Sequence, residues 1–496
     1  MDRAIAVNPK RVESHLSLAR YWEQRAKTQA DAAERGKSVA EAEKVFREAL
    51  SVDPNSSIAH LAFGDFLYSN QRLSEAEAEL RKAVELDPQD RVALTAISRF
   101  YEAQAKFDEA EKYMSKLTDV SSDKNAARAQ VIDLRARGGR VDQAISEYQK
   151  LVNDSPKYVH ARVRLADLLL GKGDVKGASQ QVEEALKISK QDTEALLMRG
   201  RIRTRNGNMR DAISDFEQVL KQEPALSSAL YYMSEAQLQN GDAERARGYV
   251  NDLLKYYPDS PAGLLMLVRI YLNQGQPNAA EAIKTAEKII NGVTLLKGNA
   301  AALQASRLPA ESLPDLESKG YAARAAAKVQ QKDLIGAQAD LEKAIQVDPR
   351  NTEARSNLAG LFMLKNELPN AQQAIEQALE VAPDNLSVVN MATTVYIQQG
   401  KFDQAHAKLD SLLAAQPNNM QLLDQKVRVY AAQKDNASIE RTLTKMLETD
   451  PDYLNAYFEL SAFYHNQGKV DEAIAKLQNI ISRRPDNPRQ MAQAHL

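Results

Sequence analysis

The sequence predicts an all-α protein built as a repeat array, and three observations lead to this. Prolines that follow helix-like segments recur at a fixed spacing: Pro54 and Pro88 lie 34 residues apart, as do Pro349 and Pro383. Most of the apolar content is alanine and leucine, placed among the strong helix formers Glu, Gln, Lys and Arg. Alanines and glycines recur in the same register. A period in this range indicates a stacked array in which each unit packs on its neighbours.

Each unit ends in a helix tail closed by proline. The segment 83–88 reads AVELDP and the segment 344–349 reads AIQVDP. Proline lacks the amide N–H and opposes continuation of a helix, so it ends the second helix of each unit. The prolines in this register are Pro54, Pro88, Pro156, Pro224, Pro258, Pro349, Pro383, Pro417, Pro451 and Pro485.

Small residues form two further series within the units. Alanine marks the expected closest approach of two helices, at Ala76, Ala110, Ala144, Ala178, Ala212, Ala246 and Ala280, and then at Ala337, Ala371, Ala405 and Ala473. The twelfth unit departs from alanine at this place. Glycine precedes alanine by five residues at Gly173, Gly207, Gly241 and Gly275. We expect these glycines to end the first helix in a left-handed conformation.

The spacing divides the chain into two sub-arrays, residues 1–293 and 318–496, with roughly thirteen repeats in total. Residues 294–317 break the period and are predicted to be a surface excursion, an additional helix or a joint. Extra residues near 27–38 are predicted to lengthen the helices of the first unit. Both ends look like repeats cut short, so we expect the chain to be a piece of a longer protein.

Composition excludes several classes of function. The net charge of −2, from 65 basic and 67 acidic residues, argues against a general nucleic-acid binder. With no cysteine there is no disulfide, thiolate nucleophile or Cys-ligated zinc site. No apolar run of about 18 residues occurs, so no membrane span is predicted. The lack of cysteine favours an exported bacterial protein of the periplasm or cell envelope, with the cytoplasm as the alternative.

The sequence offers no recognisable chemistry for catalysis. The six histidines show no metal-ligand spacing, and His-Glu-x-x-His is absent. Gly171-Lys172-Gly173 falls where a repeat turn belongs and follows no strand, which makes it a turn and not a phosphate loop. We therefore predict no catalytic residues, no cofactor and no metal, and a protein that is not an enzyme.

The recurring residues resemble the signature of the tetratricopeptide repeat (TPR) along almost the whole chain. The match is carried by Gly64, Ala76, Ala83, Pro88, Phe216, Pro224, Tyr271, Gly275 and Ala280. The resemblance implies a right-handed superhelical α-solenoid of antiparallel helix pairs. Its front helices would line a concave groove that binds peptides or proteins. The asparagines of the chaperone-binding and glycosyl-transferring subfamilies are absent, apart from Asn357, so neither subfamily is expected.

The resemblance also places positions 2, 5, 9, 12 and 13 of each front helix in the groove. Position 9 is charged in the second to eighth repeats and nearly neutral after residue 317, where it reads Ala326, Gly360, Thr394, Arg428 and Ala462. We predict partner-binding residues at Asp65, Tyr68, Arg99, Asp133, Asp167, Arg201, Arg205, Tyr231, Glu235 and Arg269. The alternative interpretation is a solvated face whose charges pair between neighbouring repeats, each exposed pair contributing little.

Three hypotheses for function follow. The first is an interaction scaffold that holds peptide or protein partners in the groove. The second is a recruiting or regulatory arm of a larger enzyme or bacterial envelope machine, such as one for exopolysaccharide secretion. The third is nucleic-acid binding through the arginine-rich segment 199–210, which the charge balance disfavours.

Overall fold

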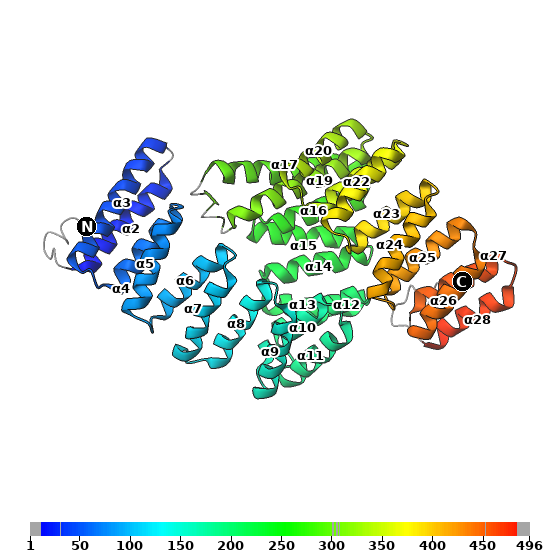
Figure 1. Cartoon of the computed structure of the whole chain (residues 1–496), viewed down its shortest axis with the longest axis horizontal. Coiled ribbons are helices and arrows are strands. Elements are labelled where there is room, and N and C mark those ends of the chain that lie inside the picture. The colour runs from blue at the N-terminus through cyan, green and yellow to red at the C-terminus, as the bar shows by residue number, and fades with distance from the viewer. Residues whose placement is uncertain are drawn as a thin grey trace. The chain divides into compact units, whose positions relative to one another are not determined.

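A computed structural model describes residues 11–483, apart from 30, 300, 301, 304, 305, 307 and 452. Within these ranges every regular element is a helix, which confirms the predicted all-α solenoid (Figure 1). No helix among the described residues combines the length and apolar character needed to cross a membrane. The partial repeats predicted at the two chain ends lie outside the described residues.

The described residues form two compact units. The first holds the chain up to Ile202 and the residues described between Leu296 and Ala310; the second holds Arg203–Leu295 and the chain from Glu311 onward. The division falls inside α12. Elements of the first unit are α2 (Val12–Thr28), α3 (Ala32–Val52), α4 (Ser57–Ser69), α5 (Leu73–Leu86), α6 (Arg91–Ala103), α7 (Phe107–Val120), α8 (Lys124–Arg137), α9 (Val141–Asp154), α10 (Val159–Gly171), α11 (Val175–Ile188) and most of α12 (Thr193–Arg205).

The second unit continues the same alternation of front and back helices. Its elements are α13 (Met209–Gln222), α14 (Ser227–Gln239), α15 (Ala243–Tyr256), α16 (Pro261–Asn273), η1 (Gln276–Asn278), most of α17 (Ala279–Gly298), η2 (Ala310–Ser312), α19 (Leu313–Gln330), α20 (Leu334–Val347), α21 (Thr352–Leu364), α22 (Leu368–Val381), α23 (Leu386–Gln398), α24 (Phe402–Ala415), α25 (Met420–Gln433), α26 (Asn436–Thr449), α27 (Leu454–Asn466) and α28 (Val470–Arg483).

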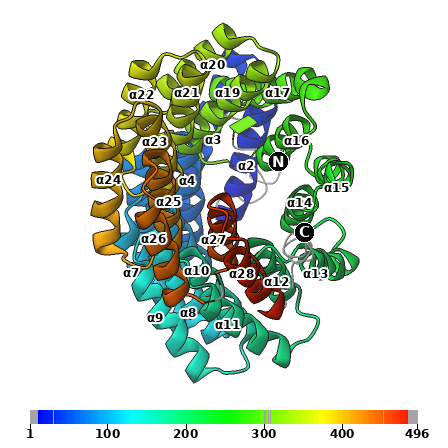
Figure 2. The same cartoon turned by 90° about the vertical axis from the view of Figure 1, so that its right-hand side faces the viewer.

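Each front helix packs on its own back helix and on the front helices of neighbouring repeats. In the first unit α4 contacts α5 and also α2 and α6. In the second unit α14, α15 and α16 lie side by side in both views (Figures 1 and 2). This stacking buries apolar clusters between successive repeats, as expected for a solenoid.

A residue with positive φ stands in the turn between the two helices of most described repeats. The predicted left-handed glycines are confirmed, with φ between 79° at Gly207 and 87° at Gly173. Other repeats reach positive φ at the same place without glycine, at Gln71, Ala105, Lys332, Asn366 and Lys434. Packing therefore imposes this turn even where the residue opposes it, since a left-handed conformation costs a non-glycine residue roughly 1–2 kcal/mol.

The alanine series lies at the closest helix approach. Its members from Ala76 to Ala246 and from Ala337 to Ala405 are fully buried. The prediction for Ala280 was wrong, because Ala280 is exposed and the buried Ala282 is the fourth residue of α17, the place that Ala246 has in α15. The tight 3-10 turn η1 directly precedes α17 and shifts the buried position by two residues.

The irregular segments lengthen helices. In the first repeat α2 has 17 residues and α3 has 21, against 13 in α4 and 14 in α5. In the eighth repeat α17 has 20 residues, and α19 at the start of the ninth has 18. One apolar cluster joins Val268 of α16, Ala282 of α17 and Ala327 of α19. The core therefore continues from α16 to α19. The predicted domain limits 1–293, 294–317 and 318–496 stay a prediction.

Candidate binding groove

A groove of about 970 Å³ lies across three consecutive front helices of the first unit, α4, α6 and α8. It brings together four of the predicted partner-binding residues: Asp65, Tyr68, Arg99 and Asp133. Back-helix residues such as Leu80 and Leu117 contribute apolar surface. We call this the α4–α8 groove.

The charged residues at the centre of the α4–α8 groove differ in what holds them. Asp65 and Arg99 are both exposed, and within the described residues neither makes a hydrogen bond or an ion pair. Loss of hydration in the groove, followed by the negative charge of Glu23, raises the pKa of the Asp65 carboxyl above its ordinary value. Tyr68 belongs to the wall, where its ring meets that of Phe100 edge-on at 5.5 Å.

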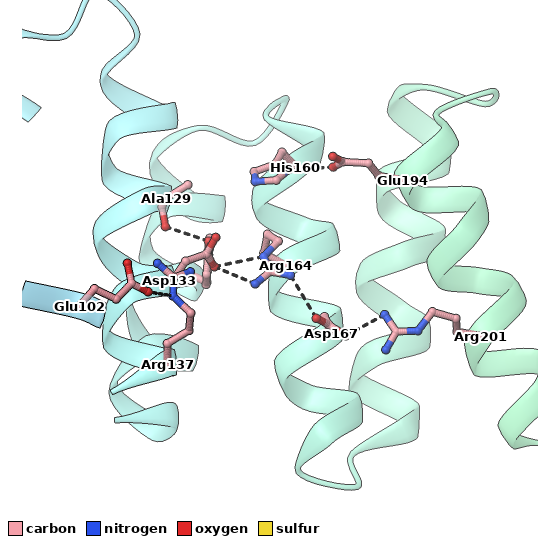
Figure 3. Close-up of polar contacts among 10 residues, drawn as sticks. Glu102, Ala129, Asp133, Arg137, His160, Arg164, Asp167, Glu194 and Arg201 are labelled. Carbon is pink, nitrogen blue, oxygen red and sulfur yellow. Dashed lines mark hydrogen bonds and ion pairs between the residues drawn. The ribbon is translucent and has the colours of Figure 1, made fainter. Parts of the chain in front are cut away.

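A row of paired charges follows directly after the groove and runs from α8 to α12 (Figure 3). Oδ1 of Asp133 accepts hydrogen bonds from Nε and Nη2 of Arg164, at 3.1 and 3.0 Å. Arg164 also donates to Asp167 at 3.1 Å, and Arg201 donates to the other oxygen of Asp167 at 2.9 Å. We call Asp133, Arg164, Asp167 and Arg201 the polar ladder.

Burial anchors the first rung of the polar ladder. The hydroxyl of Tyr148 lies 2.7 Å from Oδ1 of Asp133, and the Tyr148 side chain is completely buried. Burial, followed by the Asp133 carboxylate, raises the pKa of Tyr148 well above its usual range. Asp133 therefore serves a buried hydroxyl and a guanidinium together, which makes it a structural acceptor although it also borders the α4–α8 groove.

Two further ion pairs bridge neighbouring front helices in this region. Nδ1 of His160 in α10 lies 2.7 Å from Oε2 of Glu194 in α12. This hydrogen bond raises the pKa of His160 above its ordinary value. Arg137 of α8 pairs with Glu102 of α6, at the edge of the α4–α8 groove.

The arginine-rich helix α12 has internal partners for three of its side chains. Arg201 binds Asp167 within the ladder, and Arg199 lies 3.6 Å from Glu183. Arg203 pairs at 2.6 Å with Asp215, a buried carboxylate of α13. Arg205 is the last residue of α12 and is exposed. A ligand role for Arg201 and Arg205 stays a prediction.

The remaining predicted residues lie in the second unit. Arg269 of α16 is 3.5 Å from Glu235 of α14, again across one repeat. The ring of Tyr231 meets that of Tyr232 edge-on at 5.4 Å, and burial raises the pKa of Tyr231. The structure therefore gathers four of the ten predicted residues in one groove and places the other six along the neighbouring front helices.

Sequence reasoning missed the residue that organises the ladder. Arg164 stands three residues before Asp167, at position 6 of its front helix, and no role was predicted for it. The sequence feature that could have revealed the role of Arg164 is its spacing from two opposite charges, since it lies 31 residues after Asp133 and three before Asp167. Among the described residues no group of three or more His, Asp or Glu side chains is arranged to hold a metal ion.

Comparison with protein families identifies the array. The tetratricopeptide repeat family matches residues 135–202, 204–264, 238–305, 328–394, 365–426 and 430–496, which together span well over half of the chain. The chain belongs to the tetratricopeptide repeat family. Residues 26–138 match the middle TPR-like domain of cilia and flagella-associated protein 70. TPR proteins bind protein partners, and the family is generally a non-catalytic scaffold.

Two solved structures show a limited likeness to this chain. A tetratricopeptide repeat protein from Parabacteroides merdae ATCC 43184 is 17% identical, with a TM-score of 0.40, over 54% of this TPR chain and 97% of its own. A structure of Naa15/Naa10 bound to HypK-THB is 14% identical, with a TM-score of 0.30, over 100% of this chain and 92% of its own. No curated protein has a sequence that matches this TPR chain.

Proposed function

We propose that this TPR protein is an interaction scaffold and that the α4–α8 groove holds a segment of a protein partner. The observation that carries the proposal is the groove itself, about 970 Å³ in volume and lined by three successive front helices. Its walls combine many charged and polar side chains with apolar ones such as Leu80, Phe100 and Leu117, which suits a peptide that carries both kinds of side chain. The exposed charges of Asp65 and Arg99 can fix the orientation of a bound segment.

Filling the groove tests this proposal. A library of random dodecapeptides displayed on phage is selected against the whole chain, and the enriched peptides are synthesised with a fluorophore. Ala96 lines the groove, so Ala96→Trp places a large ring in the path of the peptide. Lys112→Trp, on the exposed face of the back helix α7, is the matched control.

Fluorescence anisotropy then measures the affinity of each peptide. We expect peptides to bind the wild type and Lys112→Trp equally and to lose affinity for Ala96→Trp by roughly tenfold or more, since the ring removes the contact surface. Circular dichroism shows whether both variants keep their helical content. Enriched peptides that bind all three proteins equally contradict the groove as the site. A selection that enriches no peptide contradicts the function.

The interpretation of the chain as a recruiting arm of a larger bacterial envelope or secretion machine stays a hypothesis. It requires the same groove and adds a second claim about the surrounding protein. Fusion to an envelope or catalytic domain in the complete reading frame would support it, and a reading frame that ends with the array would contradict it.

A further inference from the structure

The α4–α8 groove contains two opposite charges that the fold leaves without partners. Asp65 of α4 and Arg99 of α6 occupy the same place in successive repeats, and no ion pair joins them within the described residues. The pair Asp167–Arg201 has the same spacing of 34 residues and is closed at 2.9 Å. Asp65 and Arg99 are therefore available to groups that enter the groove.

Of the other charged residues that line the groove, some are already bonded within the fold, and one adds to the positive charge of α6. Glu102 pairs with Arg137, and Asp123 accepts the amide N–H of Ala126 as the N-cap of α8. Arg91 lines the groove from the start of α6, on the same helix as Arg99. The α6 side of the groove is thus positive and the α4 side is negative.

Apolar surface accompanies the two free charges. Val92 of α6 lines the groove and is 65% exposed, although valine usually lies inside a fold. Ala96 follows one turn later on α6 and also lines the groove. Ile58 stands at the equivalent place of α4, one repeat earlier, and is 57% exposed. A bound segment can therefore bury an aliphatic side chain beside its charged contacts.

We infer that the α4–α8 groove selects a dipolar segment of a protein partner. The segment places an Asp or Glu carboxylate against Arg99, a Lys or Arg cation against Asp65, and an aliphatic side chain on Val92. This inference rests on the proposed function and adds the chemistry and the direction of the partner. The carboxylate belongs to a side chain because Arg99 lies in the middle helix of the groove, with lining residues on both sides of it.

Charge exchange tests the inference. Peptides enriched on the wild type are synthesised with amidated C-termini, together with versions in which acidic and basic residues are exchanged. We expect the enriched sequences to carry both charges, and Arg99→Ala to weaken them by about tenfold, as loss of a charge-assisted hydrogen bond does. Asp65→Arg/Arg99→Asp is expected to prefer the exchanged peptides. Arg428→Ala is the control, since Arg428 has the same repeat position and internal partners in Asn390 and Gln425.

Three results would overturn the inference and leave the scaffold function standing. In the first, enriched peptides that lose affinity for Ala96→Trp carry no pair of opposite charges. In the second, Arg99→Ala binds them as tightly as Arg428→Ala does. In the third, a free C-terminus is required for binding, which would make a terminal carboxylate the ligand. Failure of the scaffold function is a different result, in which no peptide is enriched at all.

Discussion

The pairs Asp65–Arg99 and Asp167–Arg201 contain the same residue types at the same repeat position, yet only the second is closed. Asp167 and Arg201 are bonded at 2.9 Å within the polar ladder, while Asp65 and Arg99 stay open in the α4–α8 groove. The repeat position thus determines which face of the solenoid a side chain occupies. Its neighbours determine whether the charge is available to a partner.

The two regions differ in the residue at position 6 of their front helices. In the ladder Arg164 stands between Asp133 and Asp167 and binds both. The equivalent positions beside Asp65 and Arg99 hold Ala62 and Ala96, which carry no charge. The short alanine side chain leaves the space that forms the groove and leaves the flanking charges unpaired.

The largest expected effect is the loss of the first ladder rung. Asp133→Ala removes the carboxylate that the buried hydroxyl of Tyr148 and the guanidinium of Arg164 share, and leaves them only the Ala129 carbonyl and Asp167, at an expected cost of about 2 kcal/mol. Asp65→Ala is the matched control and is expected to stay within about 0.5 kcal/mol of the wild type. Urea unfolding measures the free energy of unfolding of both variants, and amide hydrogen exchange measures the local stability of α8–α10. Equal destabilisation by the two variants would mean that the regions do not differ.

Substitutions in the turns between helices test the backbone strain of the two regions without changing any charge. A Cβ at Gly173 meets no atom within 4 Å, but the φ of 87° is strained for alanine, so Gly173→Ala should cost about 1 kcal/mol. Ala105 has a φ of 57° in the groove region, and Ala105→Gly should stabilise the chain by about 0.5–1 kcal/mol. The melting temperatures of the two variants and of the wild type measure these changes. A loss of stability in Ala105→Gly would show that this turn is not strained.

Copying the ladder into the groove should convert one region into the other. Ala96→Arg/Arg99→Asp reproduces beside Asp65 the arrangement of Asp133, Arg164 and Asp167. We expect a gain of about 0.5 kcal/mol from the new partly exposed ion pairs, together with loss of the groove peptides. Urea denaturation measures the gain in stability, and fluorescence anisotropy measures the loss of peptide binding. A variant that still binds the peptides at full affinity would contradict the account of how the groove is opened.

The smallest expected effect is a pH dependence of the paired region. The hydrogen bond to Glu194 raises the folded-state pKa of His160, so its stabilisation is present below the unfolded value near 6.5 and disappears as the pH rises through the folded value. His160→Gln should remove this decline on the alkaline side. Melting temperatures between pH 5.5 and 8.5 compare the two proteins, and a parallel decline in both would assign it to another group.

The sequence predicted the fold in detail because the residues that recur are the ones that pack. Buried alanines such as Ala76 and left-handed glycines such as Gly173 are imposed by close helix contacts in each repeat. It misplaced Ala280, because the 3-10 turn before α17 leaves no periodic signal. The groove was harder to predict, since it depends on which charges pair across repeats. That pairing is decided by non-recurring residues such as Arg164.

The most direct test of the difference between open and closed charges is a pair of double-mutant cycles. Single and double alanine variants of Asp167 and Arg201 are compared with those of Asp65 and Arg99, using urea unfolding with amide exchange of the front helices. The account predicts a coupling energy of about 0.5–1 kcal/mol for Asp167 and Arg201, and roughly zero for Asp65 and Arg99. Equal coupling energies for the two pairs would contradict it.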